Sequence, residues 1–139
     1  MAREFVGVSD EDRMAISRCA TDYIESWLDG DGERMRGCLH PALAKRAVYR
    51  DRSGNLQIDE SPADEMVEAA AAGRGTRYGR GYEIEVEDAF RAIASVKVTS
   101  EPYIDYLHIA RFDGKWLIVN ALWDFRDPAG WERVGSAGG

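Results

Sequence analysis

The sequence predicts one α+β domain in which helices come first and then cover one face of a curved antiparallel sheet. Apolar residues recur every three or four positions early in the chain, and every second position from residue 82 onward. The chain has 139 residues, of which 45% are hydrophobic, so it can build one substantial core. We expect an N-terminal arm at residues 1–9, the domain at 10–126 and a C-terminal tail at 127–139.

A long amphipathic helix is predicted over residues 10–29. Ser9 and Asp12 have the spacing of a capping box, and Gly30 ends the helix because glycine tolerates the left-handed turn. Apolar side chains at steps of three and four form one stripe along the helix: Ile16, Cys19, Ala20, Tyr23, Ile24, Trp27 and Leu28. This stripe is expected to pack on the rest of the domain.

Two shorter helices are predicted after the first. The second directs its apolar side chains inward: Met35, Cys38 and Leu39. Pro41 stops this helix at His40, because a proline disfavours helical geometry in the residue before it. Ser61-Pro62 is typical of the start of the third helix, as an N-cap followed by a proline in the first turn.

Period-two hydrophobicity predicts a hairpin and four further strands. The hairpin pairs residues 47–52 with residues 56–60 around a turn at 53–55. The four further strands are residues 82–90, 91–100, 103–112 and 115–126. Asp113-Gly114, a favoured two-residue turn, joins the last two strands.

Pairing the last two strands about this turn divides their side chains between two faces, because successive side chains alternate. The more aromatic face is assigned to the interior: Ile104, Tyr106, His108, Ala110, Leu117, Val119, Ala121, Trp123 and Phe125. The other face is too apolar for solvent, since it carries Leu107, Ile109, Trp116, Ile118 and Leu122. It therefore predicts a homodimer packed through this outer sheet face. A one-residue bulge would exchange the two faces.

Charge and composition disfavour several classes of partner. The net charge of −7 repels nucleic acid and anionic lipid, and no apolar run is long enough to span a membrane. The N-terminus lacks the apolar stretch of a secretory signal, so a cytoplasmic protein is expected. Cys19 and Cys38 are expected to be core thiols. No metal or other cofactor is expected, because the two histidines and two cysteines lack the spacing of metal ligands.

Three segments carry a family resemblance: WLDGD at residues 27–31, RMRGCLHPALAKR at 34–46 and DGKWLIVNALW at 113–123. Together with the order of elements, they resemble the nuclear transport factor 2-like superfamily over roughly residues 10–126. The closest match is its bacterial lumazine-binding-like group. The resemblance implies a cone-shaped α+β barrel with a deep, mostly apolar cavity, which is a natural site for a small molecule.

The superfamily includes steroid delta-isomerases, scytalone dehydratase and polyketide cyclases, as well as binding and assembly domains without catalytic activity. The resemblance places His40 where the isomerases carry a carboxylate base, and Tyr23 where these enzymes often present a hydroxyl group. His108 lies on the strand face assigned to the interior. We identify these three as candidate catalytic residues, because imidazoles titrate near neutral pH and a phenol can stabilise an oxyanion.

The candidate ligand-binding residues are those expected to line an aromatic cavity: Trp27, Met35, Tyr49, Tyr106 and Trp123. Structural interpretations stand beside the functional ones. His40 could cap the second helix, and His108, Tyr23 and Trp27 could be core residues. A basic cluster, Lys45, Arg46 and Arg50, could hold an anionic ligand at the mouth of the cone or be solvated.

Two classes of function therefore remain. The first is a domain that binds a small apolar or aromatic molecule and could act on it as a cofactor-free lyase or isomerase of the dehydratase, cyclase or ketosteroid-isomerase type. The second is a non-catalytic binding or dimeric assembly protein. No relative's full catalytic set is present, so fold alone does not choose between them.

Overall fold

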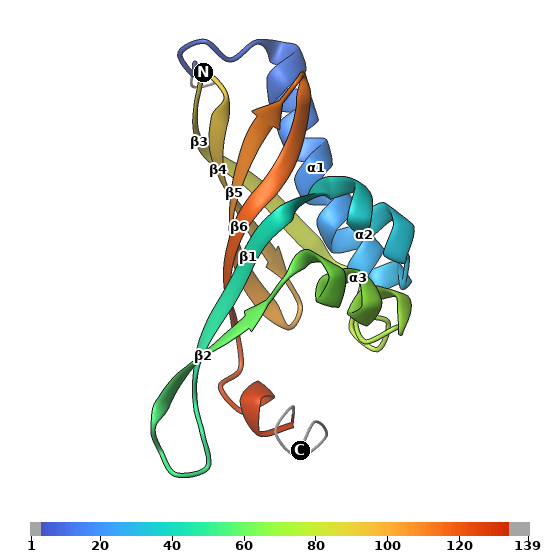
Figure 1. Cartoon of the computed structure of the whole chain (residues 1–139), viewed down its shortest axis with the longest axis vertical. Helices are drawn as coiled ribbons and strands as arrows, with labels where there is room; N and C mark the ends of the chain where they lie inside the picture. Colours follow the sequence, from blue (N-terminus) through green and yellow to red (C-terminus); the bar gives the residue numbers. More distant parts are fainter. Residues whose placement is uncertain (1–3, 134–139) are drawn as a thin grey trace.

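A computed structural model of the chain describes residues 4–133, and the end of the predicted C-terminal tail lies outside them. Three labelled helices and six strands follow one another in the described chain, and residues 130–133 add a short helical turn after the last strand. Their bounds are α1 Asp10–Asp29, α2 Gly32–Cys38, β1 Leu39–Arg50, β2 Leu56–Ser61, α3 Ala63–Ala71, β3 Tyr82–Phe90, β4 Ile93–Ser100, β5 Tyr103–Phe112 and β6 Lys115–Phe125. The helices form one layer against one side of a curved sheet, which confirms the predicted α+β class (Figure 1).

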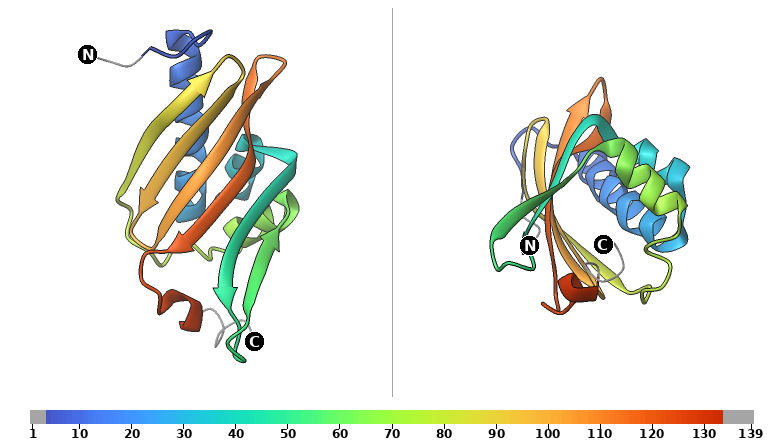
Figure 2. Two further views of the ribbon diagram at one scale, coloured as in Figure 1. Left: turned by 90° about the vertical axis from the view of Figure 1, so that its left-hand side faces the viewer. Right: turned by 60° about the horizontal axis from the view of Figure 1, so that its bottom comes forward.

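The sheet has the strand order β2-β1-β6-β5-β4-β3. All neighbours are antiparallel except β1 and β6, which run parallel. The sequence had predicted only antiparallel strands, but the chain leaves β1, passes through β2, α3 and β3–β5, and returns as β6 beside β1 in the same direction. A parallel pair needs such a crossover, so this central pairing is set by distant parts of the chain. Figure 2 shows the twist that follows and the helices gathered on one side.

The predicted first helix and its boundaries are confirmed. Ser9 Oγ accepts a hydrogen bond from the Asp12 backbone N–H, and the Ser9 N–H donates to the Asp12 carboxylate, which completes the capping box. Gly30 ends the helix in the left-handed conformation, with φ of 71°. The third helix begins one residue later than predicted, because Pro62 is its N-cap and Ser61 still belongs to β2.

A β-bulge in β6 decides which side chains of the last hairpin face the helices. Ile109 pairs with Ile118, but His108 pairs with Asn120, so Val119 is the extra residue. The pairing from the turn to this point follows the sequence prediction. Between the turn and the bulge, however, both strands direct the opposite face to the interior from the one predicted, since Ile109, Trp116 and Ile118 are buried. Beyond the bulge, β6 has its predicted phase, while β5 still has the opposite one.

The interior assignment of β5 was therefore wrong. The buried side chains of β5 are Asp105, Leu107 and Ile109, and those of β6 before the bulge are Trp116 and Ile118. The residues that we had assigned to the interior of β5, among them Tyr106 and His108, face away from the helices. Only the part of the assignment after the bulge is correct, since Ala121, Trp123 and Phe125 lie on the helix side.

The core lies between the apolar stripe of α1 and the inner face of the sheet. Its fully buried members include Ile16, Ile24, Met35, Val96, Leu107, Ile109 and Ile118. Cys19 and Cys38 are free, buried thiols, as predicted, and burial raises the pKa of the Cys19 thiol to about 12. Both are therefore packing groups rather than reactive ones. None of the described helices is long and apolar enough to cross a membrane.

Candidate functional site

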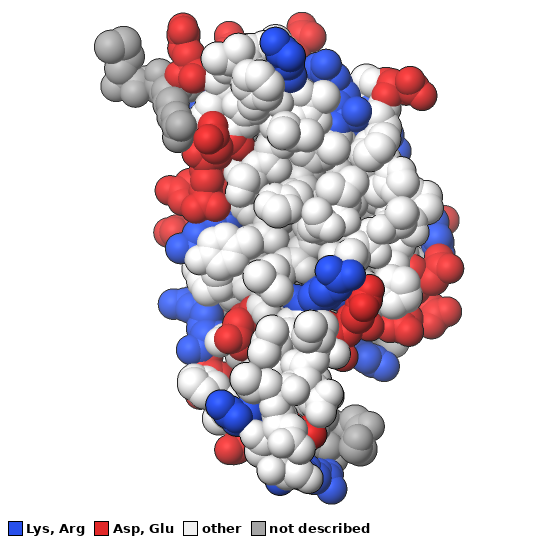
Figure 3. Space-filling model, turned by 60° about the vertical axis from the view of Figure 1, so that its left-hand side comes forward, with Lys and Arg blue, Asp and Glu red and all other residues white. Residues whose placement is uncertain are grey.

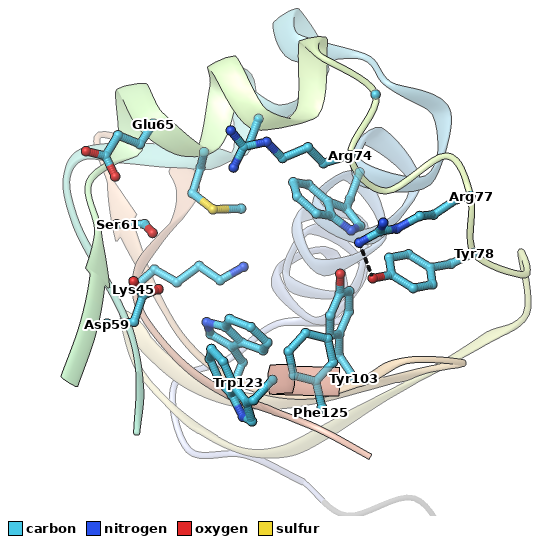
Figure 4. Close-up of a pocket in the computed structure, with 15 residues that line it drawn as sticks. Lys45, Asp59, Ser61, Glu65, Arg74, Arg77, Tyr78, Tyr103, Trp123 and Phe125 are labelled. Atoms are coloured by element: carbon cyan, nitrogen blue, oxygen red, sulfur yellow. Dashed lines mark hydrogen bonds between the residues drawn. The ribbon is translucent and has the colours of Figure 1, made fainter. Parts of the chain in front are cut away.

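A cavity of about 620 Å³ lies between the sheet and α3, next to the loop that links α3 to β3. Its walls are largely aromatic: Trp27, Tyr78, Tyr103, Trp123, Phe125 and Trp131. Its polar lining consists of Lys45, Asp59, Ser61, Glu65, Arg74 and Arg77. In Figure 4 the ends of Lys45, Arg74, Arg77 and Tyr103 point toward its centre from different sides. The size and mixture of surfaces suit one small aromatic molecule.

Lys45 forms the polar floor of the cavity. It lies on β1 between Leu43 and Ala47, both buried, so strand alternation directs its side chain toward the helices. Its Nζ lies 5.2 Å from the centroid of the Tyr23 ring, 5.8 Å from that of Trp27 and 5.3 Å from that of Trp123. Ring faces attract a cation, so this aromatic cage partly compensates the ammonium group for lost water.

A chain of hydrogen bonds runs from Lys45 into the core. Lys45 Nζ donates to Tyr23 Oη over 2.7 Å, and Tyr23 Oη donates to Asp105 Oδ1 over 2.9 Å. Tyr23 and Asp105 are only 3% and 2% exposed, and neither lines the cavity. They come from α1 and β5, so the chain joins the helical layer to the sheet. Together the three residues form a polar relay beneath an aromatic cage.

Burial shifts the two ends of this relay toward their neutral forms. It lowers the pKa of the Lys45 ammonium, a shift that the carboxylates of Asp105 and Asp59 oppose. It raises the pKa of Asp105, although Lys45 and Tyr23 favour the ionised carboxylate. Burial also raises the pKa of Tyr23, which therefore stays a phenol. The ion pair and the neutral pair are thus closer in energy here than they are in water.

The aromatic wall continues into the C-terminal segment. The ring centroids of Tyr103 and Trp123 are 5.3 Å apart, and those of Trp123 and Trp131 are 5.0 Å apart. Trp131 also stacks on Tyr49 at 5.3 Å, which anchors the turn at residues 130–133 to β1. The sequence analysis had left Trp131 in a tail outside the domain, yet this residue lines the cavity.

Neither histidine lines the cavity. His40 lies at the start of β1, where its Nδ1 accepts a hydrogen bond from the Ala42 N–H and its ring lies 4.5 Å from that of Phe112. His108 is exposed on the outer sheet face, with Nδ1 3.3 Å from Asn120 Nδ2. The expected cavity position of both was wrong: His40 lies beside Phe112, next to the turn of the β5–β6 hairpin, and His108 faces outward because it alternates with the buried Leu107 and Ile109.

The other candidates divide into two groups. Trp27 and Trp123 lie in the cavity wall. Tyr23 lies beneath the floor. Met35 is fully buried against Ser26 in the core, away from the cavity, and Tyr49 contacts the cavity only through Trp131. Tyr106, at 46% exposure, lies on the outer face, so its expected position in the cavity was wrong for the same reason as that of His108.

Besides Trp131, two residues of the polar relay were missed as site residues in the sequence. Lys45 was grouped with Arg46 and Arg50 as a cluster at the mouth, although its alternation with Leu43 and Ala47 marks it as inward-facing. Asp105 was assigned to the outer face, because the bulge in β6 leaves no clear signal in the sequence. Among residues 4–133, no group of three His, Cys, Asp or Glu side chains is arranged to hold a metal ion.

The chain belongs to the family described as "Putative lumazine-binding", whose model matches residues 11–124. No protein with a curated description matches the sequence. Among solved structures, an NTF2-like protein of unknown function from Silicibacter pomeroyi has a TM-score of 0.65 at 15% identity, over 84% of this chain and 97% of that one. One from Shewanella baltica has a TM-score of 0.62 at 13% identity, over 84% and 95%.

A ketosteroid isomerase-like protein from Erwinia carotovora has a TM-score of 0.57 at 13% identity, over 86% of this chain and 100% of that one. At these identities the likeness shows the fold alone. It confirms the predicted nuclear transport factor 2-like architecture. The chemistry of the site has to be read from the residues of this chain.

Proposed function

We propose that the cavity binds a planar, largely aromatic small molecule that carries an anionic or strongly polarised oxygen atom. The observation that supports this most directly is the position of Lys45 Nζ on the floor of an aromatic cavity. Flat rings match the walls formed by Trp27 and Trp123. An oxygen atom with negative charge would accept a hydrogen bond from an ammonium group that makes one to Tyr23 and has other N–H donors to offer.

The rim supports the same chemistry. Arg74 and Arg77 lie on the α3–β3 loop and reach toward the cavity, in a protein whose net charge is −7 (Figure 4). The Arg77 guanidinium donates a hydrogen bond to the Tyr78 hydroxyl over 3.0 Å. The acidic lining residues Asp59 and Glu65 lie on the opposite side, along β2 and α3, and Lys45 extends from beside Asp59 toward the centre of the cavity. A ligand with one negative end and an apolar body fits this asymmetry.

A lyase or isomerase that uses a histidine base is not supported, because both imidazoles lie outside the cavity. If the protein catalyses proton transfer, the acid/base groups at the floor are Lys45, Tyr23 and Asp105. The two buried free thiols also suit a reducing compartment such as the cytoplasm.

The binding proposal is tested by tryptophan fluorescence, because three of the four tryptophans line the cavity. We expect 2-naphthoate to bind about tenfold more tightly than 2-naphthamide, since a hydrogen bond to a charged group contributes about 1.5 kcal/mol or more. 2-Naphthylmethylamine should bind worst. Lumazine belongs in the same panel because of the family description. Lys45→Met should remove the preference for the carboxylate.

The matched control is Lys115→Met, which removes the same charge at an exposed position on β6. It should leave all four affinities unchanged. The proposal fails if no compound in the panel changes the fluorescence of the folded protein. It also fails if the amine binds best, since the cage would then be a site for cations.

We further propose that the protein forms a homodimer through the outer sheet face. The residues that carry this proposal differ from those first predicted, because Leu107, Ile109, Trp116 and Ile118 are buried in the core. The outer face instead exposes Val48, Leu56, Ile58, Phe90, Ile93, Tyr106 and Leu122. Figure 3 shows a largely uncharged area in the middle of this face, with acidic and basic residues around its edges. Such an expanse is typical of an interface.

Sedimentation velocity at micromolar concentration tests the dimer. Leu122 is 55% exposed and pairs across the sheet with Tyr106, at the centre of the outer face. Leu122→Glu should weaken dimerisation about 100-fold or more, because burying an unpaired charge costs several kcal/mol. Met14→Glu, a similar change at an exposed position on α1, should leave the dimer intact. A monomeric wild-type protein, or a dimeric Leu122→Glu variant, would contradict the proposal.

A further inference from the structure

We propose that Lys45 is a nucleophile that condenses with the carbonyl group of an aromatic aldehyde or ketone to form an imine. This inference rests on the proposed function, because the same cavity has to accept the aromatic part of the substrate. It names a more specific class of ligand, one whose polarised oxygen belongs to a carbonyl group. It also gives the buried polar relay a chemical role that binding alone does not require.

The positions of the lysines single out Lys45. The chain has three: Lys45, Lys97 and Lys115. Lys97 lies on the outer face of β4, where its Nζ lies 5.9 Å from the Tyr106 ring centroid, and Lys115 is exposed at the start of β6. Only Lys45 lines the aromatic cavity, so only there would an aromatic carbonyl compound be held beside an amine. Holding two reactants together in this way lowers the barrier to their reaction.

A nucleophilic amine has to lose a proton, and the relay provides an acceptor. Tyr23 Oη accepts an N–H from Lys45 while its own O–H donates to Asp105. When Lys45 passes a proton to Tyr23 and Tyr23 passes its own to Asp105, the result is a neutral amine, an intact phenol and a neutral carboxyl group. The net charge of the floor does not change, so no proton has to come from or go to solvent.

The environment favours this transfer from both ends. Burial lowers the pKa of Lys45 and raises the pKa of Asp105, so both shifts stabilise the products of the transfer. The ionisable groups that act on Lys45 are Asp105 on β5 and Asp59 on β2, with Tyr23 on α1 as its hydrogen-bond partner. The carboxylates of Asp105 and Asp59 both oppose the lowering of the Lys45 pKa, Asp105 more strongly. Protonation of Asp105 removes its share of this effect.

The condensation balances without any other reactant. The lone pair of the neutral Lys45 amine attacks the carbonyl carbon, and one amine proton moves to the carbonyl oxygen to give a carbinolamine. The proton held on Asp105 returns through Tyr23 to the hydroxyl group, which leaves as water while the nitrogen lone pair forms the C=N bond. The product is a protonated imine beside an ionised Asp105. Of the three ammonium protons, two leave in water and one stays on nitrogen.

Reductive trapping tests the proposal. The protein is incubated at pH 7 with 2-naphthaldehyde and sodium cyanoborohydride, and the labelled amines are located by peptide mapping with mass spectrometry. We expect Lys45 to be labelled about tenfold or more faster than Lys97 and Lys115, because the cavity holds the aldehyde beside its amine and burial favours the neutral form of that amine. 2-Naphthoate, which occupies the cavity but cannot condense, should protect Lys45 and leave the other two lysines unaffected.

Tyr23→Phe removes the relay hydroxyl and should slow the labelling of Lys45 about tenfold while Lys97 still reacts at its original rate. Near-ultraviolet circular dichroism checks that this variant is folded, and the comparison among the wild-type lysines decides the question even if it is not. The imine proposal is overturned if 2-naphthoate binds but Lys45 reacts no faster than Lys97. Absence of binding by both naphthalene compounds would instead refute the proposed function.

Discussion

Replacing Asp105 with alanine is expected to lower the free energy of unfolding by about 3 kcal/mol or more at pH 7. The carboxylate is only 2% exposed, and it accepts the hydrogen bond from Tyr23. Its removal leaves the Tyr23 hydroxyl without an acceptor and the Lys45 ammonium without its nearest opposite charge in the relay. A buried charge that loses its partner costs far more than the intact pair contributes. Urea denaturation followed by far-ultraviolet circular dichroism measures the loss.

A double-mutant cycle separates this cause from the loss of packing. Lys45→Met keeps a long apolar side chain in the cage and removes the charge. If the carboxylate mainly compensates Lys45, the double variant should lose clearly less stability than the sum of the two single variants. Asp105→Asn, which keeps the shape, should fall between the wild-type protein and Asp105→Ala. Strict additivity, or a loss below about 1 kcal/mol for Asp105→Ala, would show that the relay contributes little to the fold.

Local patterns were enough to predict most of the elements. The stripe on α1 and the period-two strands arise from neighbours in sequence, and their boundaries agree with the structure to within one or two residues. The first half of β1 was missed, because Pro41 ends a helix as readily as it occupies a strand. The parallel pairing of β1 with β6 was missed for another reason, since it joins segments about 75 residues apart through contacts that no local pattern reports.

The site was harder to predict than the fold. Trp27 and Trp123 lie in segments whose phase is set locally, and the structure places both in the cavity wall. Asp105 and His108 lie on β5, whose phase relative to β6 depends on a single bulged residue. Because the bulge was not predicted, His108 was expected in the interior and Asp105 on the surface, which is the reverse of their positions in the structure. A shift of one residue in the strand register therefore decides whether His108 or Asp105 faces the helices.

Deletion of Val119 is expected to abolish the native fold, because this residue forms the bulge. Without it, side chains on one side of the deletion have to exchange faces. Either Trp116 and Ile118 turn from the core to solvent, or Ala121 leaves the core and Trp123 leaves the wall of the cavity. Each large apolar side chain that loses its burial costs about 1.5–3 kcal/mol, and all residues on that side move together, so the loss approaches the whole stability of an ordinary domain. Near-ultraviolet circular dichroism and amide NMR spectra should show no native tertiary structure.

Val119→Ala is the matched control, since it keeps the residue count of β6 and removes only a half-buried side chain. It should remain folded and lose about 1 kcal/mol. If the deletion variant gave native spectra and still bound 2-naphthoate, the β5–β6 turn would have absorbed the missing residue, and the bulge would not be what fixes the two faces. If it unfolds while Val119→Ala does not, the extra residue in β6 is what keeps Asp105 buried beneath the floor of the cavity and His108 on the surface. The position of the relay residues would then be set first by the register of the backbone, and only after that by contacts between side chains.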